Sequence, residues 1–145
     1  MSKVWIETAL GRLRSESGRS GGARRVVVEF LGRRECCVSA QEIHDGLRAG
    51  GARIGIASVY RTLEGLDELG LVQRVDLGDG VSRFERTDPA GEHHHHLVCG
   101  DCGKVEPFED PALEKAIAGV AGGRGYAVAA HEVVLRGACG DCRVG

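Results

Sequence analysis

The chain has 145 residues and a formal net charge of only −2 at pH 7, with 19 Lys/Arg against 21 Asp/Glu. This length suits one large domain or two small ones, and no apolar run approaches the roughly 20 residues that a membrane-spanning helix needs. The N-terminal segment is typical of an amphipathic helix rather than an export signal, which predicts a cytoplasmic protein with reduced thiols and no membrane partner.

Charge is distributed unevenly along the sequence. Residues 1–57 carry ten Lys/Arg and six Asp/Glu, for a charge of +4, whereas residues 87–145 carry five and nine, for a charge of −4. A basic first half can face phosphates and an acidic second half can attract cations. An imbalance of a few charges also arises by chance.

Four helices are predicted in the first half, where apolar residues recur at helical spacing. Ser39 begins an S-x-x-E capping box that starts the third helix, and Gly50-Gly51 follow its end. Gly70 occupies the position after the fourth helix where glycine commonly ends helices. The expected ranges are residues 4–15, 23–33, 39–49 and 57–69.

The apolar pattern then changes to that of strands. Residues 71–77 and 81–86 flank Gly78-Asp79-Gly80, which is a favourable hairpin turn. Helices followed by a two-stranded hairpin are the order of a winged helix-turn-helix domain. The sequence therefore predicts such a domain over residues 1–86.

A second, smaller unit is predicted after a hinge at residues 87–92, which contain Pro89 and Gly91. Short strands are expected near residues 94–99 and 105–108, a helix at 111–121 and a strand at 126–136. Residues 93–145 thus form a small C-terminal α/β unit, and the fold class of the whole chain is α+β.

The fourth helix has a polar face. Ser58, Tyr60 and Arg61 lie off its apolar stripe, as a recognition helix in the major groove requires. Arg24 and Arg25 begin the second helix, where positive charge can meet the DNA backbone. Each residue alone is more commonly a solvated surface side chain, but helix order, hairpin and charge together favour double-stranded DNA as a partner.

Four of the six cysteines form two C-x-x-C pairs, Cys99/Cys102 and Cys139/Cys142, with 36 residues between them. Each turn of this kind lets two sulfurs converge on one tetrahedral ion. The two pairs therefore predict a structural Zn²⁺ site. The alternative is a pair of redox dithiols.

A run of four histidines precedes the first cysteine pair. If this run is a strand, alternate side chains point to opposite faces, so one tetrapeptide can supply two ligands to each of two sites. A surface cluster of histidines is the alternative. The histidines facing the DNA-binding half, and their candidate partners, are His94, His96, Glu85 and Cys37. Those facing the second unit, and theirs, are His93, His95, Glu114 and His131.

Together these motifs resemble the ferric uptake regulator (Fur) family of metal-dependent repressors. The resemblance covers about residues 24–142 and rests on residues 38–43 (VSAQEI), 58–63 (SVYRTL), 83–85 (RFE), 93–102 (HHHHLVCGDC) and 137–142 (GACGDC). It implies a winged-helix DNA-binding domain hinged to an α/β dimerisation domain. It also implies a homodimer that binds AT-rich inverted repeats when loaded with metal.

The resemblance assigns the ligand groups to sites. The four C-x-x-C cysteines match the family's structural zinc ligands, and His94, His96 and Glu85 match its hinge sensor site. The second histidine group matches a further metal site in the dimerisation domain. Many members have a histidine before the V-S-A stretch, where this chain has Cys36-Cys37. Cys37 is therefore the expected fourth hinge ligand, with a buried apolar cysteine as the alternative.

The departures from the family pattern bear on the sensed metal. A thiolate at Cys37 favours Zn²⁺ over Fe²⁺, and the HHHHLVC form resembles the zinc uptake regulator (Zur) branch. Some actinobacterial zinc regulators use an aspartate after the recognition helix and a cysteine after the wing. This chain has Gln73 at the first position and Arg86 or Thr87 at the second.

The expected function is a zinc-responsive repressor that acts on palindromic operators, without enzyme activity or a small organic substrate. The first alternative is a Fur-type regulator that responds to Fe²⁺ or another metal. A thiol or zinc enzyme is less favoured, because no H-E-x-x-H helix, nucleophile elbow or phosphate loop is present. The polar face of the fourth helix argues against a zinc store that does not bind DNA.

Overall fold

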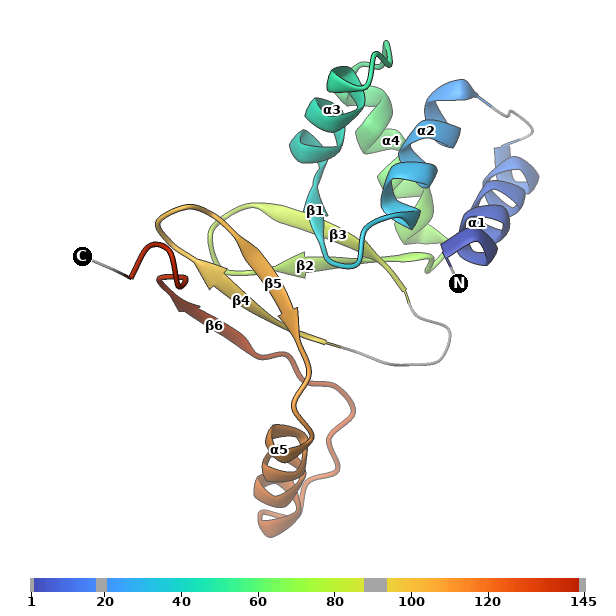
Figure 1. Ribbon diagram of the computed structural model, residues 1–145. Coiled ribbons are helices and arrows are strands. Elements are labelled where there is room, and N and C mark those ends of the chain that lie inside the picture. Colours follow the sequence, from blue (N-terminus) through green and yellow to red (C-terminus); the bar gives the residue numbers. More distant parts are fainter. Residues whose placement is uncertain (1, 18–20, 88–93, 144–145) are drawn as a thin grey trace. The chain divides into compact units, whose positions relative to one another are not determined.

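The computed structural model describes residues 2–17, 21–87 and 94–143, which divide into two compact units, Met1–Gly91 and Glu92–Gly145. Figure 1 shows helices beside a small sheet in the first unit, and a second sheet with one helix in the second unit. Along the described part of the chain, no helix has the length and apolar character needed to span a membrane.

The first unit contains four helices and a three-stranded antiparallel sheet. The sheet has the order β1-β3-β2. Its apolar interior comes from all four helices and includes Trp5, Val28, Ile43, Leu63 and Phe84. The elements are α1 (Ser2–Ser17), α2 (Gly22–Gly32), β1 (Val38–Ser39), α3 (Ala40–Ala49), α4 (Ile56–Glu68), β2 (Val72–Asp76) and β3 (Ser82–Arg86).

Local signals in the sequence explain these boundaries. The Ser39 side chain accepts a hydrogen bond from the Glu42 backbone N–H at 3.1 Å, which confirms the predicted start of α3. Gly70 has a φ of +71°, a left-handed conformation that glycine adopts without steric cost, and it follows α4 as expected. The predicted hairpin is confirmed as β2 and β3.

The second unit contains β4 (His95–Cys99), β5 (Val105–Phe108), α5 (Pro111–Gly123) and β6 (Val134–Gly137). Its sheet has the order β5-β4-β6, in which β4 is antiparallel to β5 and parallel to β6. Asp110 caps α5 by accepting hydrogen bonds from the backbone N–H groups of Ala112 and Leu113. The mixed helix and sheet content of both units confirms the α+β class.

Two strands differ from the sequence prediction. The strand expected at residues 126–136 begins only at Val134, because β6 pairs with the short β4 strand from His96 to Cys99. β1 was not predicted, since two residues carry no periodic pattern, and it forms by pairing Val38 with Phe84. Most of the predicted hinge at 87–92 lies outside the described residues.

The second unit has little apolar interior. Among its described residues only His95, His96 and Cys99 are buried, and α5 has no buried residue. Apolar side chains of this unit are instead exposed: Val120 by 63%, Tyr126 by 74% and Leu135 by 50%. Figure 1 shows α5 standing away from the sheet of its own unit, so other interactions must hold this unit together.

Candidate metal centres and nucleic-acid interface

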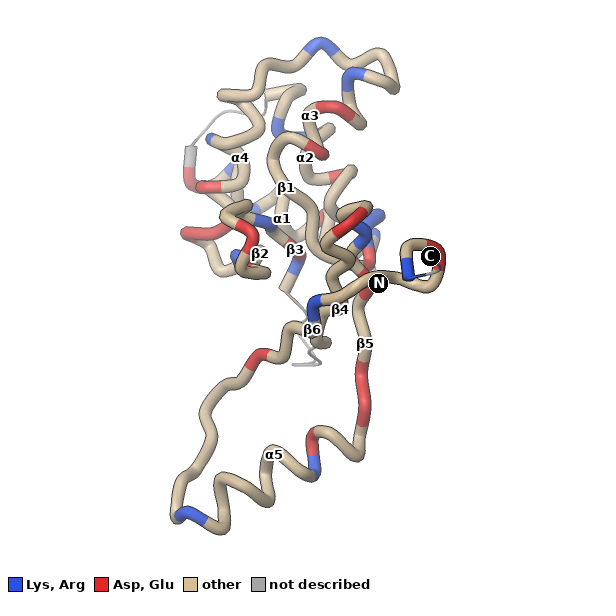
Figure 2. Tube along the Cα trace, turned by 90° about the vertical axis from the view of Figure 1, so that its left-hand side faces the viewer, with Lys and Arg blue, Asp and Glu red and all other residues tan. Residues whose placement is uncertain are grey.

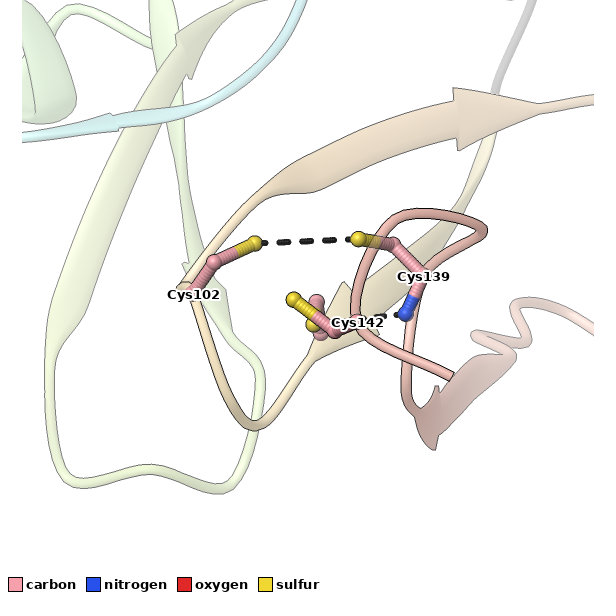
Figure 3. Close-up of side chains that lie close together, drawn as sticks. Cys102, Cys139 and Cys142 are labelled. Carbon is pink, nitrogen blue, oxygen red and sulfur yellow. Dashed lines mark hydrogen bonds between the residues drawn. The ribbon is translucent and has the colours of Figure 1, made fainter. Parts of the chain in front are cut away.

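The parallel pairing of β4 and β6 brings the two C-x-x-C pairs together. Cys99 ends β4 and lies opposite Gly137, so the turns carrying Cys102 and Cys139 follow at the same end of the sheet. Figure 3 shows the side chains of Cys102, Cys139 and Cys142 pointing toward one another. The sulfurs of all four cysteines lie within 4.8 Å of one another, and those of Cys102 and Cys139 are 3.8 Å apart.

This spacing fits a tetrahedral ion. With zinc–sulfur bonds of about 2.3 Å, the edge of a tetrahedral four-thiolate site measures about 3.8 Å. The backbone N–H of Cys139 donates to the Cys99 sulfur at 3.3 Å, which fixes the two turns relative to each other. The four cysteines are thus arranged as a closed metal site.

The thiols of this cluster differ in acidity. Hydrogen bonds from the backbone N–H groups at Cys102 and Cys139 lower the pKa of Cys99 to about 6. Hydrogen bonding with the neighbouring sulfurs of Cys139 and Cys99 raises the pKa of Cys142 to about 12. One thiolate therefore forms near neutral pH, and an incoming ion must displace the proton of Cys142.

A second group of ligands lies within the same unit. The Nε2 atoms of His95 and His131 lie 2.5 and 2.6 Å from the two carboxylate oxygens of Glu114. His95 is 2% exposed, and its Nδ1 accepts a hydrogen bond from the Val133 backbone N–H at 3.2 Å. The nitrogen that faces Glu114 is therefore Nε2, the atom that could bind an ion.

The electrostatics of this group favour a carboxylate. The pKa of Glu114 lies below its ordinary value, mainly because His95 is hydrogen-bonded to it and also because of His131. Two imidazoles and one carboxylate are a donor set that suits zinc and similar divalent ions. The structure brings together His95, Glu114 and His131, and the fourth predicted member, His93, lies outside the described residues.

The alternation predicted for the histidine run appears in the second unit. The rings of His94 and His96 form a pair with centroids 4.9 Å apart, and each offers a nitrogen within 4.8 Å of the other. His95, between them, is directed to Glu114. One short segment therefore serves two groups of ligands.

The remaining predicted ligands belong to the first unit. A Glu85 oxygen and the Cys36 sulfur lie within 4.8 Å of each other, so the structure brings Cys36 into this group although the sequence prediction chose Cys37. Cys37 is buried, with its sulfur 3.9 Å from that of Cys36. Its pKa is raised, first by the hydrogen bond with Cys36 and then by burial. The sequence could have indicated Cys36 as a candidate ligand only because it is adjacent to Cys37.

The polar face of α4 is accessible. Tyr60 is 49% exposed, Arg61 is exposed, and Ser58 is half-buried. The Arg61 guanidinium donates to the Ser58 hydroxyl at 3.1 Å, so the two side chains lie along one side of the helix. At the start of α2, Arg24 is half-buried, and Arg25 is exposed and lies 3.6 Å from Glu29.

Charge differs between the elements of the two units. Figure 2 shows basic and acidic positions mixed on the helices of the first unit, and acidic positions on β5 and at the start of α5 in the second. The acidic segment consists of Glu106, Glu109, Asp110 and Glu114. The four helices of the first unit hold seven Lys/Arg and eight Asp/Glu, so the basic character predicted for this half does not belong to its helices as a whole, whereas the acidic segment of the second unit follows the prediction.

Comparisons with known proteins agree on one family. Residues 16–136 match the ferric uptake regulator family. The chain is 35% identical over 139 residues to the ferric uptake regulation protein of Bacillus subtilis, covering 94% of this chain and 93% of that one. It is 39% identical over 108 residues to that of Bordetella parapertussis, covering 74% and 76%.

A solved structure is similar over almost the whole chain. It is the Helicobacter pylori ferric uptake regulator, described as revealing three functional metal binding sites. The TM-score is 0.81 at 28% sequence identity, and the match covers 97% of this chain and 95% of that chain. This likeness confirms the predicted architecture of a winged-helix domain followed by a small α/β domain.

Proposed function

The chain belongs to the ferric uptake regulator family, and from this premise we propose that it is a zinc-responsive repressor that binds AT-rich palindromic operators as a homodimer when loaded with metal. Members of this family are metal-responsive transcription regulators rather than enzymes. One observation carries the proposal: the chain has a complete four-sulfur cluster and, separately from it, further groups of His, Glu and Cys ligands.

The four-sulfur cluster supplies the structural role. Cys99, Cys102, Cys139 and Cys142 hold Zn²⁺ in a closed site, which leaves no coordination position for substrate or water. Because the unit around it buries few apolar side chains, the bound ion contributes directly to folding. This site is occupied whether or not the protein is bound to DNA.

The regulatory role falls to ligands divided between the two units. The first unit offers Glu85 and the Cys36-Cys37 pair, and the second offers His94 and His96. Neither set completes a four-coordinate site with protein ligands alone, so we infer that one ion takes ligands from both. Such an ion stabilises the form that binds DNA, and DNA must then raise metal affinity by the same factor.

The His95, Glu114 and His131 group, which the sequence extends with His93, is a further metal site in this proposal. It joins β4, α5 and the segment before β6. Metal there would hold α5 to the sheet and support the surface used for dimerisation.

Zinc is the proposed signal because the sulfur of Cys36 lies within 4.8 Å of a Glu85 oxygen. Sulfur ligands favour Zn²⁺ over Fe²⁺, which prefers harder donors. The second candidate is an iron-responsive regulator, which the names of the Bacillus subtilis and Bordetella parapertussis relatives favour. Metal selectivity measured on DNA binding decides between the two.

DNA binding and dimerisation are assigned to different units. The exposed face of α4, with Ser58, Tyr60 and Arg61, suits the major groove, and Arg24 and Arg25 suit phosphate contacts. The second unit presents exposed apolar side chains, and β5 and β6 are the outer strands of its sheet, which suits a second copy.

The test is fluorescence anisotropy of a labelled duplex carrying an AT-rich inverted repeat. Protein is titrated at buffered free Zn²⁺ and separately at buffered Fe²⁺, with salt held fixed because phosphate contacts depend on salt. We expect zinc to tighten binding by about 5- to 150-fold. The His96→Ala variant should lose most of this increase while remaining a folded dimer.

A scrambled duplex and the Glu106→Ala variant serve as controls. Glu106 is exposed on β5 and pairs with Lys104, so its removal should leave the zinc response unchanged. Zinc-dependent binding that persists in His96→Ala would refute the proposed regulatory site. Tightening by Fe²⁺ alone would replace zinc with iron as the signal.

A further inference from the structure

Cys36 and Cys37 form a vicinal pair whose two sulfurs lie on the same side of the chain. Their sulfur–sulfur distance is 3.9 Å. In an extended strand successive side chains point to opposite faces, so adjacent sulfurs this close require a bend in the backbone. The structure has that bend at residues 35–36, between α2 and β1. The loop thus presents two sulfurs together rather than one.

The strand register places this pair beside a carboxylate. β1 pairs with β3 so that Val38 lies opposite Phe84, which brings Cys37, the residue before β1, toward Glu85, the residue after Phe84. The Cys36 sulfur also lies within 4.8 Å of a Glu85 oxygen. Gln73, from β2, donates to Glu85 at 2.5 Å and so fixes the carboxylate from its other side.

We propose that Cys36 and Cys37 act together as a two-sulfur chelate for a thiophilic divalent ion, with Glu85 as a third ligand from the same unit. The inference rests on the proposed function, because it gives the composition of that regulatory site. It differs from the expectation of a single cysteine ligand. It also assigns most of the metal affinity to the DNA-binding unit.

The sulfur spacing supports a shared ion. A tetrahedral ion with zinc–sulfur bonds of about 2.3 Å separates its sulfurs by about 3.8 Å. The Cys36–Cys37 distance of 3.9 Å matches this value, as does the 3.8 Å between Cys102 and Cys139 in the four-sulfur cluster. The two sulfurs therefore already have the separation that a shared ion requires.

Two sulfurs at one site change its selectivity. A site with two thiolates, a carboxylate and imidazole favours zinc and softer ions such as cadmium, and disfavours Fe²⁺ and Mn²⁺ more strongly than a site with one thiolate.

The probe is Co²⁺ added to the full chain with zinc retained in the four-sulfur cluster and with Glu114→Gln in every protein, which removes the sulfur-free His95, Glu114 and His131 site. Cobalt binds such sites more weakly than zinc and does not displace it, and its thiolate charge-transfer absorption scales with the number of sulfur ligands. We expect the intensity per bound cobalt to fall by about half in Cys36→Ser and in Cys37→Ser, and to vanish in the double variant. The matched control is Glu35→Gln, which changes a residue at the same bend and leaves both sulfurs in place.

A second measurement avoids any loss of folding in the Cys37 variant. X-ray absorption at the cobalt edge of the Glu114→Gln protein, with both cysteines present, counts sulfur ligands directly, and two sulfurs are expected. A single sulfur, or a Cys37→Ser variant that is folded and has an unchanged spectrum, would overturn the chelate.

The DNA-binding titration separates this inference from the proposed function. If both sulfurs bind cobalt but no metal tightens operator binding, the chelate stands and the regulatory proposal fails. If zinc tightens operator binding and only one cysteine affects it, the regulatory proposal stands and the chelate fails.

Discussion

The carboxylate of the candidate ligand Glu85 is held in place by Gln73, a residue to which the sequence alone assigns no role. Gln73 stands where some zinc regulators have an aspartate, and in the sequence it signals only a missing ligand. In the structure it lies opposite Glu85 in the β2–β3 pairing and donates to the carboxylate at 2.5 Å. A hydrogen bond of this kind orients a ligating carboxylate, so Gln73 is a positioning residue for the proposed site.

Which individual ligands could be predicted depended on how local their geometry was. The alternation of His94, His95 and His96 follows from strand geometry and needed no tertiary information. The choice between Cys36 and Cys37 depended on a bend in the loop before β1, and a bend of this kind leaves no periodic pattern in the sequence. His131 was found through its residue type and the family resemblance, since the irregular segment before β6 carries no local signal.

Asp79 in the β2–β3 turn should make stability depend on pH. Arg83 donates to both carboxylate oxygens, at 3.0 and 2.8 Å, and these hydrogen bonds hold the pKa of Asp79 below its ordinary value. A lowered folded pKa means that the charged form stabilises the fold. The contribution is therefore present above about pH 4 and is lost as the pH falls through the lowered pKa.

The Asp79→Asn variant should be less stable at pH 7 by about 1 kcal/mol or less, because the carboxylate is 37% exposed and solvent screens the pair. Urea unfolding of variant and wild type between pH 7 and pH 3 measures the difference. The two curves should converge toward the acid end. A constant difference across that range would show that the charge of Asp79 contributes nothing, and Asp67→Asn, on exposed α4 surface, is the control.

At the level of elements, helices were predicted more accurately than strands. Ser39 and Gly70 mark helix ends through a local hydrogen bond and a left-handed backbone conformation. Both depend on residue type, so they can be predicted from the sequence. β1 exists because Val38 and Ser39 pair with β3, and β6 is short because β4 is short. Both facts depend on distant partners, so no local pattern could have set those limits.

The four-sulfur cluster should control the folding of the second unit by itself. In Cys102→Ala we expect one fewer zinc per chain and loss of ordered β4–β6 structure, because structural zinc supplies folding free energy. The single Trp of the chain, Trp5, is buried in the first unit and bonds to the Leu71 carbonyl oxygen at 3.0 Å. Its fluorescence should therefore report an almost unchanged transition for that unit.

Hydrogen exchange of residues 94–143 measures the predicted loss of ordered structure in the second unit. Exchange there should become fast in Cys102→Ala and in wild-type protein treated with a strong chelator. Asp101→Ala, an exposed residue in the same turn, should remain protected. Full protection of the second unit without metal would exclude a structural role for the cluster.

For the whole molecule, the second unit indicates where a partner copy would bind. Its described residues include only three buried side chains, and its apolar residues on α5 and β6 are exposed. The Leu135→Asp variant, which puts a charge on the 50% exposed β6 position, should weaken dimerisation at least about tenfold, or ~1.4 kcal/mol. Light scattering coupled to size-exclusion chromatography measures the change.

The control is Val4→Asp, the same change at an apolar residue of the first unit that is 66% exposed. It should leave the dimer intact. A Leu135→Asp protein that remains dimeric at low concentration would place the dimer interface away from β6. Operator affinity should fall together with dimerisation, because a palindrome is read by two copies.

The small interior of the second unit also bears on how long the protein persists in a cell. A newly made chain that meets no zinc would leave α5 and β6 unprotected, and proteases act on such open segments. A chain that matured earlier would keep its closed cluster and its partner. If the proposed function holds, zinc starvation would reduce the supply of finished repressor as well as release it from operators, and recovery of repression would follow the pace of protein synthesis.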